Sequence, residues 1–275
     1  MKKVLFIIGV FLLVGSVSVS EVYAQSPEVD RMLDLGKSFY EKGQFQDAED
    51  VFRQLIMSGN ENSALYYNLG NAHYNQGDVG LALLNYRKAQ LLKPRDIEAK
   101  KNIEVAKKIS ENARLTPSNN LVADITNLAV NSFSINEIAI GSLLCWNLLL
   151  FGLAVAIFKF KYGIRVVAKV FVIFMLPIGL VSITLLGIQI DYQQLRPAVV
   201  MIADETEVAA GPGREYRLIT SVKNGSEGRQ IKELGDWRKL SLHEGEIEGW
   251  VPADAVGVVV VGDGNILPSL RPLFD

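Results

Sequence analysis

Three long runs of apolar residues stand out from an otherwise mixed pattern of hydrophobic and polar positions. The first covers residues 4–19, follows Lys2 and Lys3, and ends shortly before Ala24. A basic start, a short apolar run and a small residue at the cleavage point are typical of a secretory signal peptide. We therefore predict a signal peptide over residues 1–24. An uncleaved N-terminal anchor is the alternative, although the run is short for a membrane span.

The other two runs cover residues 138–158 and 170–190, and each has 21 residues without a charge. At a rise of about 1.5 Å per residue, a helix of this length spans about 31 Å, which is close to the thickness of the hydrocarbon core of a bilayer. Two helices that are uncharged on every face would be unusual in a soluble protein. We therefore predict two transmembrane helices; two buried helices of a globular core are the alternative.

The charges around these runs predict their orientation. The connecting segment, residues 159–169, carries four basic residues and no acid, whereas Glu137 and Asp191 flank the outer ends. Basic residues in short loops stay in the cytoplasm. We therefore predict a cytoplasmic loop, with both larger segments, residues 25–114 and 191–275, on the outer side of the membrane.

The segment at residues 25–114 contains an internal repeat. Its small residues would allow two antiparallel helices to approach closely, its aromatic residues would fill the space between them, and one pair of glycines would end a helix. The pattern resembles the tetratricopeptide repeat, whose period is 34 residues. Four pairs of similar residues are 34 positions apart: Gly36 and Gly70, Gly43 and Gly77, Ala48 and Ala82, Phe52 and Tyr86.

The resemblance predicts an α-helical solenoid with repeats at about residues 29–62 and 63–96 and a capping helix at 97–113. Such arrays bind peptides or partner domains in the groove that the first helices of the repeats form. Three tyrosines beside an asparagine and two lysines would suit a protein partner that offers backbone amides and an acidic group. The alternative is that the tyrosines only pack, with solvated hydroxyls. Counting along the repeat predicts these groove residues: Leu33, Lys37, Tyr40, Tyr67, Asn71, Tyr74 and Lys101.

The last segment has a different pattern. Apolar and polar residues alternate between frequent turns, which predicts a small all-β domain. Gly-Asp-Trp at residues 235–237 and Gly-Trp-Val at 249–251 resemble a bacterial SH3 domain, an SH3-like barrel at about residues 197–260. Trp237 and Trp250 are the candidates for its ligand groove, or they complete the barrel core and rim.

Charge narrows the partners of this last segment. Residues 191–275 hold 14 acidic and 9 basic residues. That balance argues against nucleic acid as a ligand and favours a protein partner or a cell-wall peptide. Residues 115–137 are predicted as a linker and 261–275 as a tail.

The sequence offers little for catalysis or metal binding. Cys145 lies inside the first predicted span, and His73 and His243 lie in separate segments. They do not suggest a Ser-His-Asp triad, and no phosphate-binding loop is present. We therefore predict that the chain is not an enzyme and uses no metal or cofactor. Two acidic pairs are predicted on solvated surfaces: Glu49 with Asp50, and Asp204 with Glu205.

The order of these parts, more than any single motif, resembles the BatE-type proteins of the aerotolerance-associated Bat families. The resemblance implies a bacterial inner-membrane adaptor with periplasmic repeat and SH3 modules. Its implied partners are Bat proteins with von Willebrand A domains and a MoxR-type ATPase, in oxygen tolerance or envelope stress. The competing hypothesis is a membrane protein that senses the cell wall by binding peptidoglycan through its SH3 domain. A channel subunit is disfavoured because neither span has an ionisable residue inside it.

Composition fits these assignments. The chain has 275 residues, a mean hydropathy of +0.20 and a formal net charge of −2. The three apolar runs account for the positive hydropathy, so the remaining modules are ordinary polar domains. A nearly neutral chain also lacks the basic excess of a nucleic-acid-binding protein.

Overall fold

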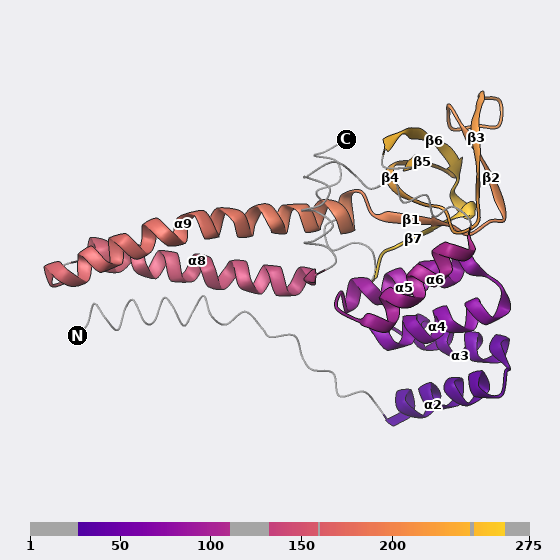
Figure 1. Ribbon diagram of the computed structural model, residues 1–275, viewed down its shortest axis with the longest axis horizontal. Helices are drawn as coiled ribbons and strands as arrows, with labels where there is room; N and C mark the ends of the chain where they lie inside the picture. The colour runs from indigo at the N-terminus through magenta and orange to yellow at the C-terminus, as the bar shows by residue number, and fades with distance from the viewer. Residues whose placement is uncertain (1–26, 111–131, 159, 243–244, 262–275) are drawn as a thin grey trace.

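The computed structural model describes residues 27–110, 132–158, 160–242 and 245–261. The predicted signal peptide, most of the predicted linker and tail, and His243 lie outside the described residues. The described chain forms a helical array, a pair of long apolar helices and a β domain (Figure 1).

The helical array consists of five antiparallel helices. Gly36 faces Phe52, and a Cβ at Gly70 would lie 2.7 Å from the ring of Tyr86, so the helices approach closely only because these positions are glycines. Gly77 ends the fourth helix with φ of +90°, in the left-handed region that favours glycine. The sequence thus predicted the packing of both repeats. The helices are α2 (Pro27–Glu41), α3 (Phe45–Met57), α4 (Ser63–Gln76), α5 (Val79–Leu92) and α6 (Ile97–Ile109).

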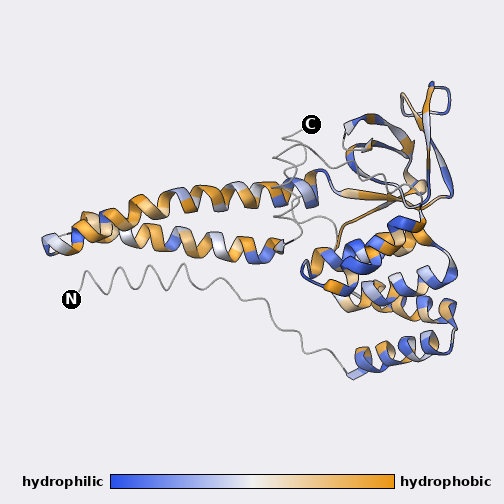
Figure 2. Cartoon of the chain, viewed as in Figure 1, coloured by the Kyte–Doolittle hydropathy of each residue, from blue (hydrophilic) through white to orange (hydrophobic). Residues whose placement is uncertain are grey.

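Two long apolar helices follow, α8 (Ile135–Ile157) and α9 (Tyr162–Ile190), and they pack side by side as a hairpin (Figure 1). Apolar residues lie on all sides of both helices (Figure 2). Gly152 lies against Phe171, and the Ser142 hydroxyl donates to the Ser182 carbonyl oxygen at 3.2 Å. Both helices are long and apolar enough to cross a membrane.

The hairpin differs from the expected boundaries at both ends. Helix α8 begins at Ile135 because Ser134 and Glu137 form a capping box, in which each side chain accepts a hydrogen bond from the other residue's backbone N–H. Helix α9 begins at Tyr162, so Arg165 and Lys169, which we placed in a loop over residues 159–169, lie in the first turns of the helix. The helical path continues past Ile190 as a π-helical turn, η1 (Asp191–Leu195).

The C-terminal part is a small β domain with one seven-stranded antiparallel sheet, in the order β3-β2-β6-β5-β4-β1-β7. Its interior consists of Val199, Met201, Leu240, Leu242 and Val251, together with neighbouring apolar side chains. This confirms an antiparallel β domain. The strands are β1 (Ala198–Met201), β2 (Glu205–Ala209), β3 (Leu218–Lys223), β4 (Glu227–Leu234), β5 (Trp237–Leu242), β6 (Ile247–Pro252) and β7 (Val256–Val258).

The β domain packs against the last repeat, although the hairpin separates the two in sequence. One buried apolar cluster includes Leu83 and Ile103 from the helices and Val200 and Val259 from the β domain. A Cβ at Gly80 would lie 2.5 Å from the carbonyl oxygen of Met201, so α5 and β1 are in close contact. The two domains therefore share part of their core.

A charged cluster lies at the same interface. The Arg87 guanidinium of α5 donates to both carboxylate oxygens of Glu227 on β4, at 2.6 and 3.1 Å. Lys107 of α6 lies 2.5 Å from Glu227 Oε2. Burial alone would raise the pKa of Glu227, but the two cations outweigh it and hold the pKa at about 2. One carboxylate thus joins α5, α6 and the β domain; we call these three residues the Glu227 cluster.

Both domains also contact the same end of the hairpin (Figure 1). Arg95, in the turn between α5 and α6, pairs with Glu137 in the first turn of α8. On the other side, Arg229 of β4 lies 3.6 Å from Asp191 and stacks over the ring of Tyr192 at 4.3 Å. The turn that joins α8 to α9 lies at the far end of the hairpin.

The Glu227 cluster predicts acid sensitivity. A carboxyl whose pKa falls from 4.5 to about 2 on folding contributes its stabilisation in full above about pH 4.5 and loses it as the pH falls toward 2. We expect Glu227→Gln to lower the free energy of unfolding by about 3 kcal/mol at pH 7 and the difference from wild type to vanish near pH 2. Tryptophan fluorescence during urea unfolding of the detergent-solubilised chain measures this. Glu233→Gln, an exposed position on the same strand, is the control; an equal loss there, or a difference that does not depend on pH, would contradict the prediction.

Candidate functional site

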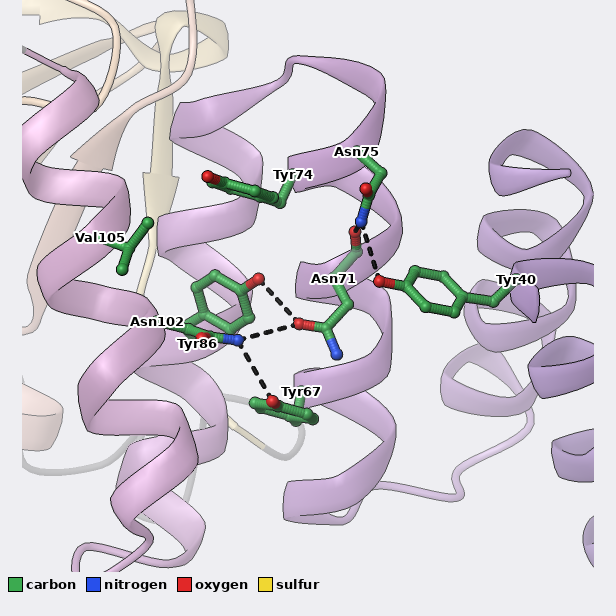
Figure 3. A pocket seen from close by; sticks show the side chains of 8 residues that line it. All are labelled: Tyr40, Tyr67, Asn71, Tyr74, Asn75, Tyr86, Asn102 and Val105. Atoms are coloured by element: carbon green, nitrogen blue, oxygen red, sulfur yellow. Dashed lines mark hydrogen bonds between the residues drawn. The ribbon is translucent and has the colours of Figure 1, made fainter. Parts of the chain in front are cut away.

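A groove of about 360 Å³ lies on the helical array, where α4 and α6 face each other (Figure 3). It contains four of the residues that the repeat pattern predicted: Tyr40, Tyr67, Asn71 and Tyr74. They come from α2 and α4, the first helices of the two repeats, so they lie on the face where the repeat pattern expected a groove. The remaining lining residues are Asn75, Tyr86, Asn102 and Val105.

Asn71 is the centre of a hydrogen-bond network in the floor of the groove. Its side-chain oxygen accepts hydrogen bonds from the Tyr86 hydroxyl at 2.8 Å and from the Asn102 amide at 3.1 Å. The Asn102 amide also donates to the Tyr67 hydroxyl at 3.2 Å. Burial raises the pKa of Tyr86, so this hydroxyl stays protonated and keeps donating. The network fixes the positions of side chains from α4, α5 and α6.

Several donors in the groove remain available to a ligand. Within the described residues, the Asn71 amide nitrogen donates no hydrogen bond (Figure 3). The hydroxyls of Tyr40 and Tyr67 accept from Asn75 and Asn102, so their own protons are free to donate. The lining contains no charged side chain. Such a groove suits neutral acceptors, of which peptide carbonyl oxygens are the most abundant in proteins.

Three predicted groove residues lie outside this lining. Leu33 packs against the core of the first repeat. Lys37 pairs with Asp34 on the exposed face of α2 at 3.3 Å, and Lys101 is exposed on α6. The groove therefore lacks the lysines that suggested an acidic partner group.

Part of the missed lining was available from the repeat itself. Val105 stands 34 residues after Asn71, so extending the count into α6 would have found it. Tyr86 was expected only to fill the space between helices, which it does with 1% exposure, while its hydroxyl also reaches Asn71. Asn75 and Asn102 have no matching polar residue in the other repeat, so no sequence signal pointed to them.

Trp237 and Trp250 lie on one outer face of the β domain. Trp237 pairs with Pro252 across the sheet, and Trp250 pairs with Lys239, two residues along β5 from Trp237. Side chains alternate along each strand, and Leu240 and Val251 point into the core, so both tryptophans point away from it. Both are half-buried. We call the surface of Trp237, Trp250 and Pro252 the tryptophan face.

The titratable residues outside the groove do not form a catalytic arrangement. His73 is buried on α4, with its Nδ1 3.6 Å from Glu49 Oε2 and 4.0 Å from Asp78 Oδ2. Burial lowers the pKa of His73, and the neighbouring carboxylates offset this only in part, so the imidazole is neutral. Among the described residues, no three His, Cys, Asp or Glu side chains are placed to hold a metal ion.

One expectation about these residues was wrong. Glu49 was expected on a solvated surface, but it is 5% exposed, between α3 and α4. Its carboxylate accepts hydrogen bonds from Arg53 at 3.0 Å and from Gln76 at 2.9 Å. These bonds satisfy a buried charge, which explains how it is tolerated there.

Comparisons with known proteins agree with parts of this description. A family model described as tetratricopeptide repeat matches residues 33–97. Over 52 residues the chain is 42% identical to the putative N-acetylmuramoyl-L-alanine amidase YrvJ of Bacillus subtilis (strain 168), a match that covers 19% of this chain and 10% of the amidase. The chain therefore spans about a tenth of the length of that relative. No solved structure matches the chain at a significant level. The family match confirms that the helical array contains tetratricopeptide repeats, which in general support protein–protein interaction.

Proposed function

We propose that this protein is a membrane-anchored adaptor that binds a protein partner in the groove of its repeats and performs no catalysis. The observation that carries the proposal is the groove itself. Tyr40, Tyr67, Asn71 and Tyr74 converge there, on the helices that tetratricopeptide repeats use for binding, and they present unpaired donors. An extended peptide whose carbonyl oxygens meet these donors is the ligand that fits best.

The hairpin supplies the membrane anchor in this proposal. A long apolar helix in the core of a soluble protein is mostly buried, whereas only 28% of the most apolar window of α8 and 6% of that of α9 are buried within the chain. Exposed apolar surface of this size needs another apolar environment, and a bilayer provides one.

Both domains would then lie on one side of the membrane, because α8 begins and α9 ends at the same end of the hairpin, where both domains make contacts. The basic residues near the opposite turn, among them Lys161 and Arg165, favour a cytoplasmic location for that turn. In this proposal the domains face the periplasm, as they do in the BatE-type proteins that the chain resembles. The partner would be a Bat-type protein with a von Willebrand A domain.

The topology has a direct test. Fusions of alkaline phosphatase after Arg114 and after Asp275 should both be active, because this enzyme needs export to fold. A fusion placed after Phe160, in the distal turn, should be inactive and serves as the matched control. Activity at Phe160, or loss of activity at either domain, would reverse the assignment.

The groove is tested by capture of partners from solubilised membranes of the source cells. Tyr67→Ala combined with Tyr74→Ala removes two aromatic walls of the groove, and we expect the recovered partner to fall about tenfold or more, as for hot-spot residues at interfaces. Lys37→Ala with Lys101→Ala is the matched control, because both lysines lie outside the lining. Equal recovery with the tyrosine and lysine variants would argue against groove binding.

A second candidate function is recognition of the cell wall by the β domain. The tryptophan face and the short similarity to a putative cell-wall amidase favour it. Two neighbouring indole rings can stack on flat or apolar parts of a ligand, and Lys239 beside Trp250 can contact a carboxylate of a cell-wall peptide.

Sedimentation of the solubilised full chain with purified sacculi separates the two functions. If the β domain binds peptidoglycan, wild type should co-sediment, and Trp237→Ala with Trp250→Ala should reduce the bound fraction at least fivefold. The Tyr67 and Tyr74 variant should bind like wild type. If wild type stays in the supernatant, the tryptophan face has no cell-wall role.

A further inference from the structure

The groove and the contact between the two domains share the same helix. Asn102 and Val105 of α6 line the groove, and Lys107, only two residues beyond Val105, pairs with Glu227 of the β domain. Five residues, less than one and a half turns, separate Asn102 from Lys107. A displacement of this part of α6 would therefore move a wall of the groove.

Helix α6 lacks the support that the other first helices have. Helices α2 and α4 are each followed by a second helix of the repeat, but the part of the chain described after α6 ends at Ser110. Only three residues of α6, Ala99, Ile103 and Ala106, are buried. A half-repeat at the end of a solenoid gains contacts from one side only, so its position depends on whatever else holds it.

The β domain supplies this further support at two points of α6. Lys107 pairs with Glu227 at 2.5 Å, and the turn at Gly225 lies against the Ser110 side chain. The same carboxylate holds Arg87 of α5, the residue next to Tyr86, whose hydroxyl is in the groove floor. Glu227 thus connects the two helices that supply Tyr86, Asn102 and Val105.

We propose that Glu227 is a positioning residue for the groove. By joining α5 and α6 to the β domain, it holds the wall formed by Asn102 and Val105, and the groove is complete only while the β domain is docked. The proposal rests on the groove being the binding site. It follows by linkage that a ligand which binds the complete groove strengthens the docking of the β domain.

Hydrogen exchange of the full chain in lipid nanodiscs tests the inference without a ligand. With Glu227→Gln we expect amides at residues 102–106 to exchange about 10- to 100-fold faster, because local opening no longer breaks a charge-assisted contact. Lys107→Met removes only the α6 partner and should show the same local rise while leaving α5 unchanged. Amides of α2 and α3 should match wild type in both variants.

Two further variants make the test specific. Glu227→Asp keeps the charge and should restore part of the protection of α6. Glu233→Gln, an exposed carboxylate on the same strand, should exchange like wild type. Unchanged exchange at residues 102–106 in both Glu227→Gln and Lys107→Met would overturn the proposal. So would a uniform rise from α2 to α6, because it would show general destabilisation instead of a local effect.

This test and the partner capture fail independently. If α6 loosens in Glu227→Gln but the Tyr67 and Tyr74 variant still captures its partner, the positioning role stands and the groove is not the partner site. If the tyrosine variant loses the partner but α6 exchange does not change, the adaptor function stands and the groove does not need the β domain.

Discussion

The arrangement of this protein depends on one charge-assisted contact between domains that are far apart in sequence. Glu227 would be costly to bury alone, since desolvation raises its pKa. Arg87 and Lys107 make its burial favourable, and each comes from a different helix of the last repeat unit. The contact therefore selects one relative placement of α5, α6 and the β domain. The shared apolar cluster around Leu83 and Val200 then adds burial to a geometry that the charges specify.

This constraint changes how the adaptor would work. Two modules on flexible linkers would gain only from their raised effective concentration near one membrane. Here the repeats and the β domain share a core, and both contact one end of the hairpin through Glu137 and Asp191. The groove and the tryptophan face are thus held at a fixed separation, so a partner must fit both surfaces as they stand, or use only one.

Local patterns made much of the fold predictable. The spacing of 34 residues found the glycines at 36 and 70 and their aromatic partners, because each contact lies within one repeat and is set by helix geometry. The two uncharged runs found the hairpin for a similar reason. The groove was half predictable: Tyr67 and Asn71 follow the repeat, but Asn102 is polar only in the third helix of its kind. The start of α8 was missed, although Ser134 and Glu137 have the spacing of a capping box.

The contact between domains could not be predicted, and the reason is physical. Arg87, Lys107 and Glu227 look in sequence like ordinary surface charges, and 140 positions separate Arg87 from Glu227. No periodicity connects residues of a helical repeat with residues of a β strand. The same holds for Glu49, whose burial depends on Gln76 in the next helix. Charges were assigned to solvent because that is their usual environment, and such an assignment fails where the fold supplies a partner from another element. In this chain those are the positions where the placement of one element relative to another is decided, so the residues that a sequence pattern treats as least informative carry the arrangement on which the groove depends.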